Sequence, residues 1–385
     1  MDIDDKRRVG IATWYQYRNY GTALQAVSLS RVVRQMGYEA VVLRHDPDPV
    51  PEKDTAKTQL LNRLIAHLEW RRGYYSIKDE RRDQLFDCFV SSSLEFYETP
   101  TPLRREDELW SGYFDAFVCG SDQIWSPRNY DSFYFLDFIS DGSKKVAYAP
   151  SFGCEAITDR SIAESMGYLL EDFSSISVRE DSGAKIVESL TGRHPQVVLD
   201  PTLLLSRGDL SSFANDDARR PSSYCLFYFL GHYSRNTEHA FACAKRLGLK
   251  TVLVPVFERD KREQNVLSTA IGPAEFVSLI KNAAYVFTDS FHGIALSVQL
   301  GVPFTCYERF KPSASSSQNT RVYNILNRLE LGDCLITRRM LESGSMDMSV
   351  SEIDWKRIDA TLNEEREKSR AFLRRALAKA CGEAR

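Results

Sequence analysis

The fold of this chain is decided by residues 9–43, VGIATWYQYRNYGTALQAVSLSRVVRQMGYEAVVL. Residues 9–14 are rich in side chains that favour a strand, and residues 40–43 predict a second strand. Between them, residues 23–36 carry apolar side chains at helical spacing, and Gly37 supplies a helix stop. A strand, a helix and a second strand in this order predict a βαβ unit and therefore a parallel sheet.

The same alternation of strand and helix continues along most of the chain. Further strands are expected at residues 116–119, 145–148, 175–178, 197–199, 224–230, 251–256 and 285–288. Residues 206–223 interrupt the series because they are polar and rich in turn-forming residues, and we interpret them as a linker. The sequence thus predicts an α/β protein with two doubly wound domains, residues 1–205 and 206–385, facing each other across a cleft. Ligands are expected at the carboxyl ends of the strands.

Two charged segments stand outside this series. Residues 50–110 have a helical pattern with aromatic residues at Trp70, Tyr74 and Tyr75, and we interpret them as an insertion on the first sheet. These rings suit either the wall of a sugar site or ordinary packing. Residues 353–380 predict an amphipathic helix, which we interpret as a packing helix, with weak association to a membrane surface as the alternative.

Composition and charge exclude several classes of protein. The 385 residues suffice for two domains, and apolar and charged contents of 43% and 27% are those of a globular protein. The formal net charge of −3 gives no general attraction to nucleic acid, so no nucleic-acid partner is expected. An anionic substrate would therefore need cations that are placed locally.

Localisation follows from what the sequence does not contain. Residues 1–8 have mixed charges and no apolar core, so we expect no secretory signal. The longest apolar stretches fall short of the ~20 residues that cross a bilayer, so no transmembrane segment is expected. We expect a cytoplasmic protein, with a peripheral position at the inner face of the membrane as the alternative. The eight cysteines are scattered without a C-x-x-C pair, which favours reduced thiols and no metal site.

Four segments with polar side chains each follow a predicted strand. They are Asn19-Tyr20-Gly21-Thr22-Ala23-Leu24-Gln25, Gly120-Ser121-Asp122-Gln123-Ile124-Trp125, Ser177-Val178-Arg179-Glu180-Asp181-Ser182 and Thr288-Asp289-Ser290-Phe291-His292-Gly293. Because the carboxyl ends of parallel strands lie at one edge of a sheet, we expect these segments to line the cleft.

Each of these segments also has a purely structural interpretation. Asn19 and Gly21 suit a turn that needs positive φ. Residues 120–122 suit the start of a helix, with Ser or Asp as its N-cap. Taken alone, Arg179 is typical of a solvated surface arginine and His292 of a hydrogen-bonded structural histidine.

Together with Asp200-Pro201-Thr202, the order of these motifs resembles the polysaccharide pyruvyl transferase family, over about residues 9–331. The resemblance implies a GT-B-like fold of two Rossmann-like domains, with the acceptor on the first and the donor on the second. It implies phosphoenolpyruvate as the donor substrate, with no bound cofactor. The acceptor it implies is a sugar of a polysaccharide or a lipid-linked oligosaccharide, which receives a pyruvate ketal on two hydroxyls.

The resemblance and the chemistry together assign roles to individual residues of both domains. Phosphoenolpyruvate carries a carboxylate and a phosphate, and Arg179 is the candidate for an arginine fork on one of them. Ketal formation needs an acid–base group near pH 7, and His292 is the candidate, with Asp289 as the orienting or auxiliary group. Ser290 and Gly293 fall on the donor side, and the mechanism requires no metal.

The chain departs from the family at Ser290. Many members have an arginine two residues before the motif histidine, and serine brings no charge, so the donor lacks one cation. Residues 307–321, which we interpret as a mobile loop, contain Lys311 and Arg321. We expect one of the two to supply the missing charge, with ordinary surface cations as the alternative. Otherwise Ser290 indicates a changed donor or a lost activity.

Two other hypotheses stay open. A nucleotide-sugar-dependent GT-B glycosyltransferase would have the same fold, since fold alone does not decide function. The second is a catalytically silent carbohydrate-binding relative. The sequence specifies neither the acceptor sugar nor the oligomeric state.

Overall fold

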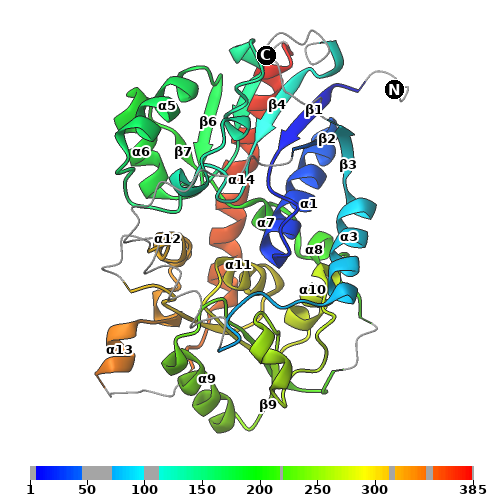
Figure 1. Cartoon of the computed structure of the whole chain (residues 1–385), viewed down its shortest axis with the longest axis vertical. Coiled ribbons are helices and arrows are strands. Elements are labelled where there is room, and N and C mark those ends of the chain that lie inside the picture. The colour runs from blue at the N-terminus through cyan, green and yellow to red at the C-terminus, as the bar shows by residue number, and fades with distance from the viewer. Residues whose placement is uncertain are drawn as a thin grey trace.

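The computed structural model shows two parallel β-sheets in two domains, one above the other in Figure 1. It describes residues 6–45, 72–98, 112–216, 220–311, 317–343 and 350–383. The predicted pair of Rossmann-like domains is confirmed, and the domains face each other in a GT-B-like arrangement.

The first sheet has the strand order β3-β2-β1-β4-β5-β6-β7, with every neighbouring pair parallel. Its strands are β1 (Arg8–Ala12), β2 (Glu39–Arg44), β3 (Glu95–Glu98), β4 (Ala116–Cys119), β5 (Lys145–Ala147), β6 (Ser175–Val178) and β7 (Gln196–Val197). β1 pairs with β2 on one side and with β4 on the other, so the strand order reverses between β1 and β4. Open α/β sheets bind ligands at such a switch point.

The second sheet has the order β12-β11-β10-β8-β9, again with parallel pairs throughout. Its strands are β8 (Tyr224–Tyr228), β9 (Lys250–Leu253), β10 (Tyr285–Thr288), β11 (Phe304–Tyr307) and β12 (Leu335–Ile336). β8 has β9 on one side and β10 on the other. The switch point of this sheet therefore lies between β8 and β10.

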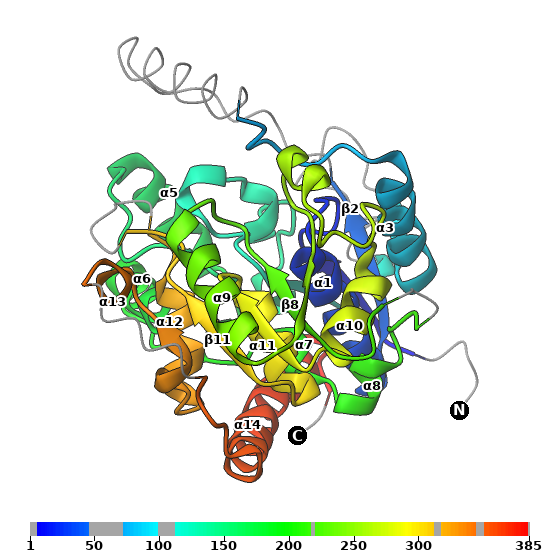
Figure 2. The ribbon, with the colours of Figure 1, turned by 90° about the horizontal axis from the view of Figure 1, so that it is seen from below.

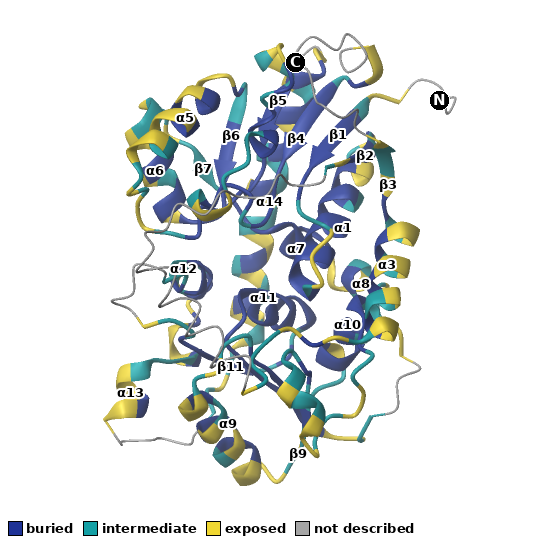
Figure 3. Cartoon of the chain, viewed as in Figure 1, coloured by how far each residue is buried: buried dark blue, intermediate teal, exposed yellow. Residues whose placement is uncertain are grey.

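Helices cover both sheets and fill the space between the domains. In the first domain they are α1 (Tyr20–Gln35), α3 (Glu80–Ser93), α5 (Arg160–Glu171) and α6 (Asp181–Thr191). In the second they are α9 (Ser234–Arg246), α10 (Pro273–Lys281), α11 (Phe291–Leu300), α12 (Thr320–Arg328) and α13 (Arg338–Glu342). Helix α11 lies between α10 and α12 in both views of the ribbon (Figures 1 and 2), and all its residues are buried (Figure 3).

Helix α1 begins three residues before its predicted start. The side chain of Asn19 is its N-cap and accepts hydrogen bonds from the backbone N–H groups of Gly21 and Thr22. At the other end Gly37 has φ +100°, as its predicted role as a helix stop requires. Buried residues extend through most of α1, because the helix contacts β2 of its own sheet and α10 and α11 of the second domain.

The interpretation of residues 50–110 as an insertion is wrong for the described part, residues 72–98. There β3 pairs in parallel with β2 and forms the edge of the sheet, and α3 precedes it. The four residues EFYE show no apolar run, because this edge strand is only partly buried. Trp70 lies outside the described residues, and the ring of Tyr74 lies 4.6 Å from that of His232 in the second domain.

Three helices connect the domains. They are α7 (Pro201–Leu204), α8 (Arg207–Ser211) and α14 (Trp355–Ala380). The predicted linker thus begins with a helix, which Ser206 caps. Helix α14 runs back from the second domain to the first (red in Figure 1), where it contacts β4 and β5. The packing of this helix therefore crosses the boundary expected at residue 205. None of the described helices is long and apolar enough to span a membrane.

Candidate active site

The polar segments at the strand ends meet in a cavity of about 400 Å³ between the two domains. Its polar and aromatic walls include, from the first domain, Trp14, Thr22 and Asp122 and, from the second, His292, Arg309 and Arg321. These residues follow β1, β4, β10 and β11, so both switch points open into one cavity.

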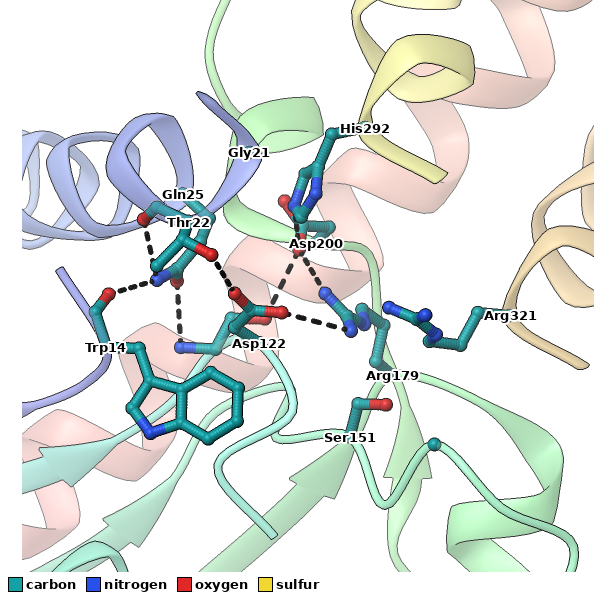
Figure 4. Close-up of polar contacts among 12 residues, drawn as sticks. Trp14, Gly21, Thr22, Gln25, Asp122, Ser151, Arg179, Asp200, His292 and Arg321 are labelled. Atoms are coloured by element: carbon teal, nitrogen blue, oxygen red, sulfur yellow. Dashed lines mark hydrogen bonds and ion pairs between the residues drawn. The ribbon is translucent and has the colours of Figure 1, made fainter. Parts of the chain in front are cut away.

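A buried glutamine joins the loops that follow β1 and β4. Gln25 donates hydrogen bonds from Nε2 to Thr13 Oγ1 at 3.0 Å and to the Trp14 carbonyl at 2.9 Å. Its Oε1 accepts a hydrogen bond from the backbone N–H of Ser121 at 3.1 Å. Figure 4 shows the contact of Gln25 with Trp14. The hydroxyl of Ser121 donates to the Ala149 carbonyl at 2.8 Å. Gln25 and Ser121 therefore position the loops rather than face the cavity.

Asp122 is held in an uncommon backbone conformation at the cavity wall. Its φ is +66°, in the left-handed region that a non-glycine residue seldom adopts. One carboxylate oxygen accepts a hydrogen bond from Thr22 Oγ1 at 2.6 Å, and the other lies 3.7 Å from Arg179 Nη2. A hydroxyl and a guanidinium thus fix the orientation of this carboxylate.

No helix starts at Ser121, so the interpretation of residues 120–122 as a helix start is wrong. The chain instead makes a tight turn at Gly120, whose φ is +122°. A Cβ atom at Gly120 would lie 1.9 Å from the carbonyl oxygen of Tyr148, so only glycine fits there. The first helical turn after β4 is a 3₁₀ turn at Pro127–Asn129.

Arg179 is buried among carboxylates, so it is not a solvated surface arginine. Its side chain is 2% exposed, and Nη1 lies 2.9 Å from Asp200 Oδ2. Nη2 lies 3.7 Å from Asp122 Oδ1 and Nε lies 3.9 Å from Glu180 Oε2. Burial alone would lower the pKa of Arg179, but the three carboxylates outweigh it and raise the pKa. The guanidinium also stacks on the ring of Phe291, 4.7 Å from its centroid.

Asp200 is the centre of the polar network between the domains. It receives hydrogen bonds from Arg179 Nη1 at 2.9 Å, Ser121 Oγ at 3.3 Å and the Thr202 N–H at 3.0 Å. His292 Nε2 of the second domain lies 3.7 Å from its Oδ2. Burial alone would raise the pKa of Asp200, but His292, Arg179 and the Thr202 N–H together hold it below its usual range. Asp200 is therefore an ionised carboxylate facing His292.

His292 reaches across the domain boundary onto helix α1. A Cβ atom at Gly21 would lie 1.9 Å from His292 Nδ1, so the glycine makes room for the imidazole. Gly21 is not among the residues with positive φ, so the turn interpretation is wrong for it. Ser290 caps α11 through the N–H of Gly293 at 3.4 Å, and a Cβ at Gly293 would lie 2.4 Å from Thr288 Oγ1. Ser290 and Gly293 thus set the start of the helix that carries His292.

Asp289 turns away from this network. Its carboxylate accepts hydrogen bonds from the backbone N–H groups of Leu230 at 2.6 Å and Gly231 at 2.8 Å. Burial raises the pKa of Asp289 despite these bonds. Asp289 fixes the loop after β8, and among the described residues the carboxylate that is ion-paired with His292 is Asp200.

Arg321 stands in the cavity wall, whereas Lys311 is exposed and does not line the cavity. Arg321 lies in the first turn of α12, is 7% exposed, and points toward Arg179 in Figure 4. Its Nη2 donates to Gln318 Oε1 at 2.8 Å, and Arg309 Nη2 donates to the same oxygen at 3.3 Å. Burial, with the neighbouring charges of Arg179 and Arg309, lowers the pKa of Arg321 to about 9. The site thus disfavours its positive charge, and an anion would relieve this cost.

Several buried nitrogens around the cavity have no hydrogen-bond partner among the described residues. They are Nε of Arg321, Nε of Arg309, Nε and Nη2 of Arg179 and Nε2 of His292. Buried polar atoms in proteins nearly always have a partner. Unused hydrogen-bonding capacity on three arginines and a histidine, gathered at one place, is what an anion site requires.

Tyr20, another predicted residue, does not line this cavity. Its ring stacks on Phe276 at 4.3 Å and its hydroxyl donates to the Ile271 carbonyl at 3.1 Å, so it joins α1 to the second domain. Conversely, Thr22, Asp200 and Arg309 belong to the site although no role was predicted for them. The Asp200-Pro201-Thr202 motif was the available signal for Asp200.

The described part of the chain has neither a metal-binding cluster nor a disulfide at this site. Among the described residues, no three His, Cys, Asp or Glu side chains are grouped in a way that would hold a metal ion. All eight cysteines are free.

Fold and site define a GT-B-like α/β protein of two domains with arginines collected in the cleft between them. The family model of polysaccharide pyruvyl transferase matches residues 19–309, more than half of the chain, and the chain belongs to this family. A search of curated protein sequences found no match.

Several solved structures are similar to this chain at low sequence identity. One is an α-glucosyltransferase in complex with UDP and a 13-mer DNA, 9% identical, covering 98% of this chain and 94% of that chain with a TM-score of 0.46. S. aureus MnaA with UDP is 10% identical, covering 93% and 91% with a TM-score of 0.46. E. coli ADP-heptose LPS heptosyltransferase II is 12% identical, covering 94% and 99% with a TM-score of 0.38. At these scores the similarities carry no conclusion about substrates.

Proposed function

We propose that this member of the family transfers the enolpyruvyl-derived group of phosphoenolpyruvate to two hydroxyls of a sugar, forming a pyruvate ketal. The observation that carries the proposal is the group of buried arginine nitrogens with unused hydrogen-bonding capacity beside His292. Family membership supports a transferase acting on polysaccharide. The acceptor in this proposal is a sugar of a polysaccharide or a lipid-linked oligosaccharide.

The arrangement of charges suits a small donor with two anionic groups. Arg309 and Arg321 line the cavity from the second domain, and Arg179 of the first domain lies buried beside Arg321 (Figure 4). Guanidinium groups bind carboxylate and phosphate through paired hydrogen bonds, so three arginines supply enough donors for both groups. Arg321 provides the cation that Ser290 lacks, and Arg309 is a further one.

The proposed reaction has a simple proton balance. Protonation of the methylene carbon C3 makes C2 an oxocarbenium-like centre, and a sugar hydroxyl forms the first C2–O bond. The C2–O bond to phosphate breaks, phosphate leaves, and a second hydroxyl closes the ketal ring. The two hydroxyls release two protons, of which one replaces the proton spent on C3 and one leaves with phosphate.

His292 is the proposed acid–base residue for these transfers, because an imidazole exchanges protons near pH 7. Asp200 lies 3.7 Å from Nε2 and stabilises the imidazolium that forms when His292 takes a proton. We assign the orienting role to Asp200, since Asp289 binds the backbone of the loop after β8.

A product assay tests the proposal. The purified protein is incubated with a glycan panel and either phosphoenolpyruvate or a set of nucleotide sugars, and mass spectrometry is used to seek a net gain of the pyruvylidene group together with release of phosphate. A gain of a hexose from a nucleotide sugar would instead identify a glycosyltransferase. Binding of glycan without any product would identify a silent carbohydrate-binding relative.

A further inference from the structure

A second and larger cavity adjoins the candidate active site. Its volume is about 760 Å³, and it lies between the start of α1, residues 76–83 and the loops that follow β8 and β9. Tyr17, Asn19 and Leu230 line both cavities, so the two adjoin at these residues. This volume lies within the range of ligand sites (roughly 300–1,000 Å³) and is larger than that of the first cavity.

The charges of the second cavity differ from those of the first. The second has three cationic and three anionic residues in its wall, namely Arg18, Lys78, Arg82, Asp79, Glu80 and Asp83. Some of these pair with one another, as Arg18 does with Asp83 at 3.4 Å. The balance of signs gives no net attraction for an anion, while the carboxylates remain acceptors for hydroxyl groups. A neutral ligand rich in hydroxyls suits this wall.

Aromatic rings complete the second cavity. Tyr20 and Tyr228 lie edge to face at 5.7 Å and contribute to its lining. Tyr17 stands at the junction of the two cavities with 46% of its surface exposed, and its ring lies 5.0 Å from that of Trp14. Tyrosine offers an apolar face beside a polar hydroxyl, the combination that a sugar ring with its C–H faces and hydroxyls can use.

We propose that the second cavity binds the part of the acceptor glycan that lies beyond the reacting sugar, so the acceptor is an oligosaccharide rather than a free monosaccharide. This inference rests on the proposed function, because the first cavity must hold the donor and the reacting sugar. Tyr17, at the junction, then contacts the glycan as it passes from one cavity to the other.

Bulky substitutions in the second cavity test this assignment. Ser76 and Lys78 are exposed and line only this cavity, so S76W and K78W reduce its volume without touching the arginine cluster. Ser91 is exposed on α3, outside both cavities, and S91W is the matched control. An unchanged melting temperature shows that each variant folds.

The measurement is binding of fluorescently labelled protein to a glycan array in the presence of phosphoenolpyruvate. Wild type and S91W are expected to bind glycans of two or more sugars, and S76W and K78W to lose this binding. The inference is overturned if S76W and K78W bind these glycans as well as the wild type does. It is also overturned if the wild type binds only monosaccharides or no glycan. Calorimetry separates the two proposals. If the wild type does not bind phosphoenolpyruvate, the proposed function is wrong. If S76W and K78W bind phosphoenolpyruvate and glycans as the wild type does, only the role proposed for the second cavity is wrong.

Discussion

The two walls of the interdomain cavity use their polar groups in different ways. On the first-domain side, Thr22 lines the cavity and Gln25 and Ser121 lie behind it, and all three make their hydrogen bonds to neighbouring loops. On the second-domain wall, Arg321 and His292 keep buried nitrogens without a partner among the described residues. A satisfied network stabilises and positions, whereas unused donors are available to a ligand. Changes on the first wall should therefore appear mainly in stability, and changes on the second mainly in activity.

The largest expected effect is on the second wall. His292→Gln removes the proposed acid–base group, and kcat should fall by roughly 10²–10⁴-fold, the range for a lost general acid–base. The melting temperature should stay close to that of the wild type, because His292 Nε2 has no hydrogen-bond partner among the described residues and lies 3.7 Å from Asp200 Oδ2. A near-native kcat in steady-state assays would reduce His292 to a structural residue.

Arg179 sits between the two walls and should show both effects. Arg179→Ala leaves Asp200, Asp122 and Glu180 buried without their cation, so the free energy of unfolding should fall by about 3–5 kcal/mol. The kcat/KM for the donor should fall as well, and this fall should correspond to a loss of about 2–4 kcal/mol in transition-state stabilisation.

Denaturant unfolding measures the first effect of Arg179→Ala. Arg160→Ala is the control, since Arg160 pairs with Glu164 on an exposed helix face and the change should alter stability by no more than about 0.5 kcal/mol. An Arg179→Ala protein as stable as this control contradicts the view that the first wall is a structural network.

Arg321→Met should separate affinity from stability. Loss of a charge-assisted contact should raise the Kd for phosphoenolpyruvate by roughly 10–100-fold. The ligand-free variant should be more stable, by about 1–4 kcal/mol, because a buried charge crowded by two other arginines is replaced by an apolar side chain. Calorimetric unfolding with and without donor measures both changes, and a destabilised ligand-free variant would show that Arg321 is structural.

The donor KM should also depend on pH in one direction. Arg321 is protonated below its pKa of about 9, so anion binding is strongest below that pH and weakens as the pH rises through it. A bound anion raises the pKa of Arg321, so the complex loses this proton, and with it affinity, at a higher pH than the free protein does. A wild-type KM that stays constant up to pH 10 would contradict the assignment of this pH dependence to Arg321. A rise in KM with pH that persists in Arg321→Met would contradict it as well.

The smallest effect is expected from Lys311→Ala. Lys311 is exposed and does not line the cavity, so the KM and kcat for the donor should change by less than about twofold. A larger change in steady-state kinetics would mean that Lys311 reaches the donor and shares the role proposed for Arg321.

The parallel sheets and the strand-end position of the site were predictable, because strands such as β4 and β10 are short apolar runs followed at once by polar residues. Strand β3 was missed because it is a partly buried edge strand with a glutamate at each end. The edge strand carries little of the periodic signal on which such predictions depend.

The arrangement within the site needed the structure. The approach of Asp200 to His292 depends on how two domains pack, and no local pattern encodes a contact between residues 92 positions apart. The same holds for Gly21. The absence of a side chain there leaves space for the His292 imidazole of the other domain and does not serve a turn. Arg321 was predicted as a cation, but its burial beside Arg179 and Arg309 was not.

The most direct test of the central claim, that the arginine cluster binds phosphoenolpyruvate as donor, is isothermal titration of the wild type and Arg321→Met with phosphoenolpyruvate and with a panel of nucleotide sugars. We predict one phosphoenolpyruvate per wild-type chain, binding at least tenfold weaker in Arg321→Met, and no heat from nucleotide sugars. Equal binding by both proteins, or binding of a nucleotide sugar without binding of phosphoenolpyruvate, would contradict the claim.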